Sequence, residues 1–149
     1  MSSWPKVEQS LAEAEQLLEK ASTEEQFQAI GLLCRETLIS LGQVVYDPAR
    51  HFPPDGVLPS RTDAKRMLEA YIQRELGGSA NQAARKWVRA SLDLANELQH
   101  KRTATFRDAA LCVEATKAVV RAIGVVSGHR LEILKSPFDR LRAKMPDLI

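Results

Sequence analysis

Cysteine is scarce in this chain of 149 residues: only Cys34 and Cys112 occur, and no CxxC or HExxH pattern is present. A small secreted domain that depends on disulfides carries more cysteines, usually at loop positions. Both cysteines fall on apolar helical faces, so we expect buried free thiols in a reducing cytoplasm. The three histidines are far apart in the sequence, which is not typical of a zinc site, and we expect no bound metal.

Long apolar runs are also missing. The longest apolar-rich stretch, 118–126, is interrupted by Arg121 and is much shorter than the roughly 20 residues that a membrane span needs. The opening residues, MSSWPKVEQS, lack the basic region and the apolar run of a secretory signal. These absences predict a protein without a membrane segment, located in the cytoplasm.

Charge of one sign is not in excess. Lys and Arg total 21 and Asp and Glu total 19, which gives a formal net charge of +2. So weak an overall field does not indicate a polyanionic partner, and any nucleic-acid site has to be a local basic patch. The GxGxxG and GxxxxGKS/T patterns of nucleotide-binding loops are absent as well. We therefore expect no cofactor.

What the chain does have is apolar residues at helical spacing. Its length and its apolar fraction of 44% are typical of one soluble globular domain. Spacings of three and four residues predict helices over about 5–20, 23–45, 64–76, 80–100 and 106–127. No segment alternates as a strand does. The predicted fold is all-α, an antiparallel up-and-down bundle of four to six helices in a single domain, 1–149.

The core of this bundle is expected to span about 23–130, with the tail 131–149 either adding one short helix or fraying. Four large side chains on the apolar stripes are predicted to be largely buried. They are Leu38, Trp87, Leu98 and Val120.

The predicted helix ends carry residues that favour capping. The expected caps are Ser22 with Glu25, Thr62 or Asp63, Thr105 with Asp108, and Gly128.

The segment 47–61, DPARHFPPDGVLPSR, has no helical periodicity and contains four prolines. A loop of this length inside a compact domain is usually functional or mobile. The alternative is a rigid crossover between helices, stiffened by its prolines. We favour the crossover, because prolines alone carry no chemistry.

One polar stripe on the predicted helix 80–100 carries the candidate functional residues. Its members are spaced by four, three and four residues, so they lie along one side of the helix. The stripe consists of Arg89, Asp93, Asn96 and His100, and the basic residues Lys101, Arg102 and Arg107 follow it.

This combination suits chemistry or binding at a phosphodiester. His100 can exchange a proton near neutral pH, Asn96 can orient a phosphate or a hydroxyl, and a guanidinium can hold phosphate oxygens. The same residues also fit a solvated helix edge, in which Asp93 pairs with Arg89 and His100 caps carbonyls at the helix end. Taken alone, the pattern favours the solvated edge.

The layout resembles the HEPN superfamily, helical domains of bacterial toxin–antitoxin, abortive-infection and RNA-processing systems. The likeness covers about 23–130, a long helix with a polar residue and a histidine four positions apart, a turn, and an alanine-rich helix. Asn96 matches the polar residue of the family's motif and His100 its histidine, but Ala95 stands where the family has arginine. The resemblance implies metal-free RNA cleavage by arginine and histidine, usually at a dimer interface.

Because Ala95 cannot hold a phosphate, the preferred interpretation is a non-catalytic HEPN-like module that binds protein or RNA in a bacterial defence or toxin–antitoxin assembly. The resemblance implies a homodimer in which the predicted helices 80–100 and 106–127 take part. The alternative is a divergent metal-independent ribonuclease that uses His100, with Asn96 orienting the phosphate and Lys101 or Arg102 supplying the cation. A third interpretation is a domain of a larger defence protein whose chemistry lies elsewhere.

Overall fold

The computed structural model describes residues 2–129, and this part of the chain contains five α-helices and no strand. The all-α prediction is therefore confirmed, while the predicted tail 131–149 lies outside the described residues. The helices are α1 (Trp4–Lys20), α2 (Glu24–Val45), α3 (Ala64–Glu75), α4 (Gln82–Gln99) and α5 (Phe106–Ser127), with a short 3-10 turn, η1 (Ser79–Asn81), before α4.

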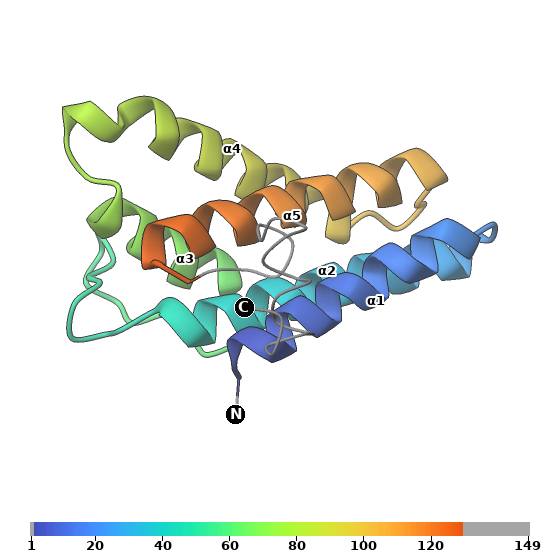
Figure 1. Ribbon diagram of the computed structural model, residues 1–149, viewed down its shortest axis with the longest axis horizontal. Helices are drawn as coiled ribbons and strands as arrows, with labels where there is room; N and C mark the ends of the chain where they lie inside the picture. The colour runs from blue at the N-terminus through green and yellow to red at the C-terminus, as the bar shows by residue number, and fades with distance from the viewer. Residues whose placement is uncertain (1, 130–149) are drawn as a thin grey trace, which may run out of the picture.

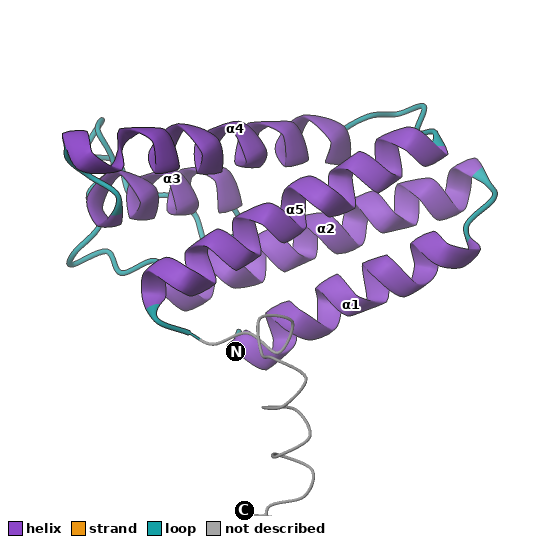
Figure 2. Ribbon diagram, turned by 45° about the horizontal axis from the view of Figure 1, so that its top comes forward, coloured by secondary structure: helices purple, strands orange, loops and turns teal. Residues whose placement is uncertain are grey.

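The long helices run up and down beside one another, as Figures 1 and 2 show. The α1–α2 and α4–α5 turns meet at one end of the bundle, where the Gln28 amide donates to the Arg102 carbonyl at 2.7 Å. Phe27 and Phe106 pack edge to face at the same end, with ring centroids 6.1 Å apart. The long connection between α2 and α3 lies at the opposite end. Helix α2 contacts all four of the other helices and is the centre of the fold.

The start of α2 differs by one residue from the prediction. Thr23, and not Ser22, is the N-cap: its hydroxyl accepts from the backbone N–H of Gln26, and the Gln26 side chain accepts from the N–H of Thr23. Gln26 therefore takes the role that was expected of Glu25. The shift follows from the backbone, because Thr23 has the extended conformation that an N-cap requires.

The other predicted caps form where they were expected. Asp63, rather than Thr62, caps α3 by accepting from the N–H of Arg66 at 3.2 Å. Thr105 and Asp108 form a reciprocal capping box at the start of α5. Gly128 ends α5 with φ of +79°, a left-handed conformation that glycine adopts without a steric penalty.

Two of the four predicted core residues are fully buried and two are not. Leu38 and Val120 have 1% and 0% exposure, as expected. Leu98 is only half-buried, and the prediction for Trp87 is wrong, because its side chain is 55% exposed. Helix α4 lies at an edge of the bundle (Figure 2). Only one narrow side of it faces the core, and that side carries Val88 and not its neighbour Trp87.

The connection between α2 and α3 is fixed to the bundle through His51. This side chain is 2% exposed, its Nδ1 accepts from the N–H of Asp47 at 2.9 Å, and its Nε2 donates to Glu75 at 2.8 Å. Arg50 binds the same carboxylate at 2.6 Å. Because Arg50 and then His51 stabilise the carboxylate, the pKa of Glu75 is lowered to about 2.

A second set of contacts fixes the far part of the same connection. Arg66 of α3 binds the Asp55 carboxylate at 2.7 Å and the Val57 carbonyl at 2.9 Å. The connection is thus held at two points by side chains of α3, as a rigid crossover would be.

Candidate functional site

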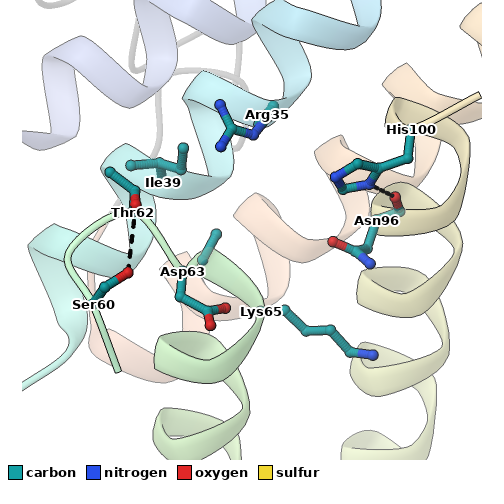
Figure 3. Close-up of a pocket in the computed structure, with 9 residues that line it drawn as sticks. Arg35, Ile39, Ser60, Thr62, Asp63, Lys65, Asn96 and His100 are labelled. Atoms are coloured by element: carbon teal, nitrogen blue, oxygen red, sulfur yellow. Dashed lines mark hydrogen bonds between the residues drawn. The ribbon is translucent and has the colours of Figure 1, made fainter. Parts of the chain in front are cut away.

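A surface cleft with a volume of about 290 Å3 lies between α2, the start of α3 and the end of α4. Figure 3 shows that the side chains around it come from three separate parts of the chain. The lining residues are Arg35, Ile39, Ser60, Thr62, Asp63, Ala64, Lys65, Asn96 and His100. Two of the residues predicted from the polar stripe, Asn96 and His100, are therefore brought together in one cleft.

His100 is the C-cap of α4, and its ring is oriented by the helix itself. Its Nδ1 lies 2.6 Å from the carbonyl oxygen of Asn96. A carbonyl can only accept, so Nδ1 must carry the hydrogen, and the neutral ring keeps its lone pair on Nε2. In Figure 3 the ring extends from α4 toward α2. The expected capping contact is present, and it leaves the other ring nitrogen available to a ligand.

Asn96 is half-buried one turn before His100. Its Oδ1 accepts from the side chain of Gln99 at 3.3 Å. The Nδ2 group has no hydrogen-bond partner among residues 2–129, so the amide can donate to a ligand in the cleft.

Arg35 supplies the cation of the cleft, and it comes from α2 rather than from α4. It is the one basic residue of α2 and is exposed, and within the described chain its guanidinium pairs with no carboxylate. Figure 3 shows the guanidinium on the opposite wall from His100. This residue was not predicted. The one available indication was a lone basic residue in a helix whose other charged residues are glutamates.

The wall next to Arg35 contains one further cation and one carboxylate. Lys65 lies 3.6 Å from Asp93 and 4.0 Å from Glu69, so its charge is largely balanced by exposed carboxylates. Asp63 faces the cleft but is engaged as the N-cap of α3. Arg35 therefore remains as the unpaired charge that a ligand would meet.

The predicted pair between Arg89 and Asp93 does not form. Asp93 pairs with Lys65 of α3, while Arg89 donates to the side chain of Gln73, also on α3. Because α3 packs beside α4, these groups reach across to it instead of along their own helix. Arg89 does not line the cleft.

The basic residues after α4 are not part of the cleft either. Lys101 pairs with Asp108 at 3.1 Å and thereby lowers the pKa of that carboxyl. Arg102 and Arg107 are exposed in the turn and at the start of α5. The predicted cluster near His100 thus forms a separate surface in which one cation is already neutralised.

Ala95, which occupies the family's arginine position, has no exposed surface. Its carbonyl oxygen lies 3.8 Å from Sγ of Cys112, and both Cys112 and Cys34 are free and buried in the core beside it. Ala95 belongs to the buried apolar core and does not line the cleft, so a side chain at position 95 enters the core. Arginine at this position would be buried in an apolar core.

The polar groups of the cleft suit an anion better than a metal ion. Within residues 2–129 no three His, Cys, Asp or Glu side chains lie close enough to hold a metal. The cleft offers two cations, an amide and an imidazole against one carboxylate. Guanidinium and amide donors in this arrangement match the oxygens of a phosphate group.

Comparison of the chain with protein-family models, with curated proteins and with solved structures finds no match. Among the described helices, none is long and apolar enough to cross a membrane.

Proposed function

We propose that this chain is a non-catalytic HEPN-like helical module that binds RNA, and that the cleft between α2 and α4 holds a phosphate of the RNA backbone. The observation that carries the proposal is the unpaired Arg35 guanidinium facing His100 and Asn96 across that cleft. The resemblance stated above places such a module in a bacterial defence or toxin–antitoxin assembly.

Each group of the cleft has a distinct role in this proposal. Arg35 makes paired hydrogen bonds to two phosphate oxygens, for which its planar guanidinium is suited. Asn96 donates to the same phosphate through Nδ2. Nε2 of His100 accepts from a ribose 2′-hydroxyl, the group that distinguishes RNA from DNA. One strong phosphate contact gives modest affinity, and the binding weakens as salt increases.

The test measures binding of a fluorescent single-stranded RNA to wild type and to Arg35→Ala at several salt concentrations. We expect the substitution to weaken binding on the order of 10-fold and to reduce the slope of log K against log salt by about 1. Arg74→Ala is the matched control, because Arg74 is exposed on α3 and is not a lining residue. Equal binding by the two variants would contradict the proposal.

A metal-independent ribonuclease is the second candidate, and it is favoured by the position of Arg35. The arginine that is missing at position 95 has a substitute on α2, opposite His100. Nε2 could take the proton of the 2′-hydroxyl, so that the 2′-oxygen attacks the phosphorus and leaves a cyclic phosphate. The departing 5′-oxygen also needs a proton donor. His100 is the one imidazole among the lining residues of the cleft, and it cannot act as base and acid in the same step, so we prefer the non-catalytic function.

The ribonuclease candidate has its own test. It requires cleavage that survives EDTA, yields cyclic phosphate ends and is lost in His100→Ala with unchanged helix content. We expect wild type to show no such cleavage. RNA binding without cleavage would leave the non-catalytic proposal standing, whereas EDTA-resistant cleavage that depends on His100 would replace it with the ribonuclease.

The resemblance also implies that the module is a homodimer, and this is part of the proposal. In the resemblance, the helices that take part in the dimer are those that correspond to α4 and α5.

A further inference from the structure

Helix α4 has two apolar sides, and only one of them is covered. The inner side packs on the core through Val88, Leu92 and Ala95. The opposite side lies at an edge of the bundle (Figure 2) and carries apolar residues that are exposed, at spacings of four, three and four. This outer face consists of Ala83, Trp87, Ala90 and Leu94. Such spacing is typical of the seam between two packed helices.

The outer face and the groove beside it offer an exposed apolar surface to a protein partner. Trp87 is 55% exposed and Leu94 is 38% exposed. An apolar groove of about 280 Å3 borders Trp87, and its floor and walls include Ala84, Ala122 and Val125. Val125 of α5 is itself 67% exposed. An exposed tryptophan beside an apolar groove is typical of an interface between proteins.

The charges beside the outer face indicate which partner fits. Lys86 lies next to Trp87, Glu97 lies just beyond Leu94, and both are exposed. They are separated by 97 − 86 = 11 residues, which is about three helical turns, so they lie on the same flank of α4. Within the described chain neither side chain has an ion-pair or hydrogen-bond partner. The flank thus carries a positive charge at one end and a negative charge at the other.

We propose that the outer face is a homodimer interface, in which α4 packs antiparallel against α4 of a second copy about a two-fold axis near Ala90. Trp87 of one copy then lies opposite Leu94 of the other, since 87 + 94 = 181 places their midpoint between residues 90 and 91. Lys86 and Glu97 have nearly the same midpoint, since 86 + 97 = 183. A single register therefore brings Trp87 opposite Leu94 and Lys86 opposite Glu97. Because the pair is symmetric, each of these contacts occurs twice.

The small side chain of Ala90 lies at the crossing point and permits close approach of the two helices. A parallel arrangement is disfavoured, because a two-fold axis along the helices would put the Lys86 and Glu97 flanks on opposite sides of the pair, where these opposite charges do not meet. The charge pattern therefore selects both a second copy of this chain and its direction. This interface does not depend on RNA binding, since neither Trp87 nor Leu94 lines the cleft.

Sedimentation of the full chain over a range of concentrations tests the apolar part of the interface. We expect wild type to be a dimer, and Leu94→Glu to raise the dissociation constant by at least about 100-fold, because in each of the two symmetric contacts a carboxylate would be buried against Trp87 of the other copy. Leu32→Glu is the matched control, because Leu32 is a 60% exposed leucine on α2, away from the outer face. Its dimer should be unchanged, and circular dichroism should show that both variants are folded. A wild-type monomer at about 100 μM, or a Leu94→Glu dimer as stable as wild type, would overturn the proposal.

Charge exchange tests the register. Lys86→Glu alone and Glu97→Lys alone each place like charges together in both symmetric pairs, and each should weaken the dimer several-fold. The double variant restores opposite charges and should regain most of the lost affinity. A double variant no better than the single ones would show that these residues do not face each other, and it would overturn the antiparallel register.

Discussion

Arg35 carries the unpaired positive charge of the cleft, yet nothing near it in the sequence marks it as a partner of His100. The two residues are 65 positions apart (100 − 35) and lie on different helices. Asn96 and His100 could be predicted because they share one side of one helix, where spacing determines proximity. Contacts between helices depend on which helices become neighbours and at what rotation. For the same reason, Asp93 pairs with Lys65 of α3 and not with Arg89.

His51 was missed for a related reason. It lies in a segment without periodicity, and its environment is created by Glu75, which is 24 positions away. Its two ring nitrogens are both used, with Nδ1 accepting from Asp47 and Nε2 donating to Glu75. His51 is thus a structural residue that holds the α2–α3 connection, and through it the cleft wall formed by Ser60 and Thr62.

The lowered pKa of Glu75 predicts acid sensitivity. A carboxyl whose pKa is lower in the folded state stabilises the fold above its unfolded pKa, and this stabilisation is lost as the pH falls. For Glu75 the window runs from about 4.5 down to about 2. We expect Glu75→Gln to lower the free energy of unfolding at pH 7 by about 1–2 kcal/mol, since Arg50 is half exposed and its attraction is screened.

Urea unfolding between pH 2 and 7 measures this effect. The difference between Glu75→Gln and wild type should shrink as the pH falls through the window. Glu36→Gln is the control, because Glu36 is exposed and does not contact this cluster. A difference that stays constant from pH 7 to pH 2 would mean that the carboxylate does not hold the connection.

At the scale of the helices, periodicity predicted where the elements lie but not how α4 is rotated. All five predicted helices are present, and their ends agree within a few residues. Apolar residues cover so wide an arc of α4 that Trp87, Val88, Leu94 and Ala95 all fitted an apolar stripe. The structure divides this arc into an inner side and an outer face. A sequence cannot make that division without knowing which neighbours cover the helix.

The two sides of α4 should respond differently to the same substitution. Leu92 is 1% exposed and packs in the core, so Leu92→Ala should lower the free energy of unfolding by about 2–5 kcal/mol. Leu94 is 38% exposed, and Leu94→Ala in a monomeric background should cost less than about 0.5 kcal/mol. A protein concentration well below the dissociation constant of the dimer provides that background.

Chemical denaturation of the matched pair measures both values. Equal losses for the two leucines would mean that α4 is rotated relative to this structure. The outer face would then not be available to a partner.

At the scale of the whole molecule, the two proposals combine into one geometry. The flank of α4 with Lys86 and Glu97 adjoins the side that carries Asp93 and His100. In an antiparallel two-fold pair, the same flanks of both helices lie together, so both clefts open on one side of the dimer. Asn96 and His100 lie about seven residues beyond the axis in each copy. At ~1.5 Å per residue the two clefts are therefore roughly 20–25 Å apart along α4.

This geometry predicts that a longer RNA binds more tightly than a short one only when the protein is a dimer. A dinucleotide can occupy one cleft, whereas a single strand of roughly twelve nucleotides can reach both, and the second contact then forms within the complex at a high effective concentration. We expect the longer RNA to bind wild type on the order of 10-fold or more tightly than the dinucleotide, after correction for the number of binding positions. Leu94→Glu should lose this gain while keeping its affinity for the dinucleotide, because its cleft is intact. Fluorescence anisotropy measures the affinity of both RNAs for both proteins. If the monomeric variant shows the same gain with length, each RNA is held by a single copy, and the two clefts do not act together.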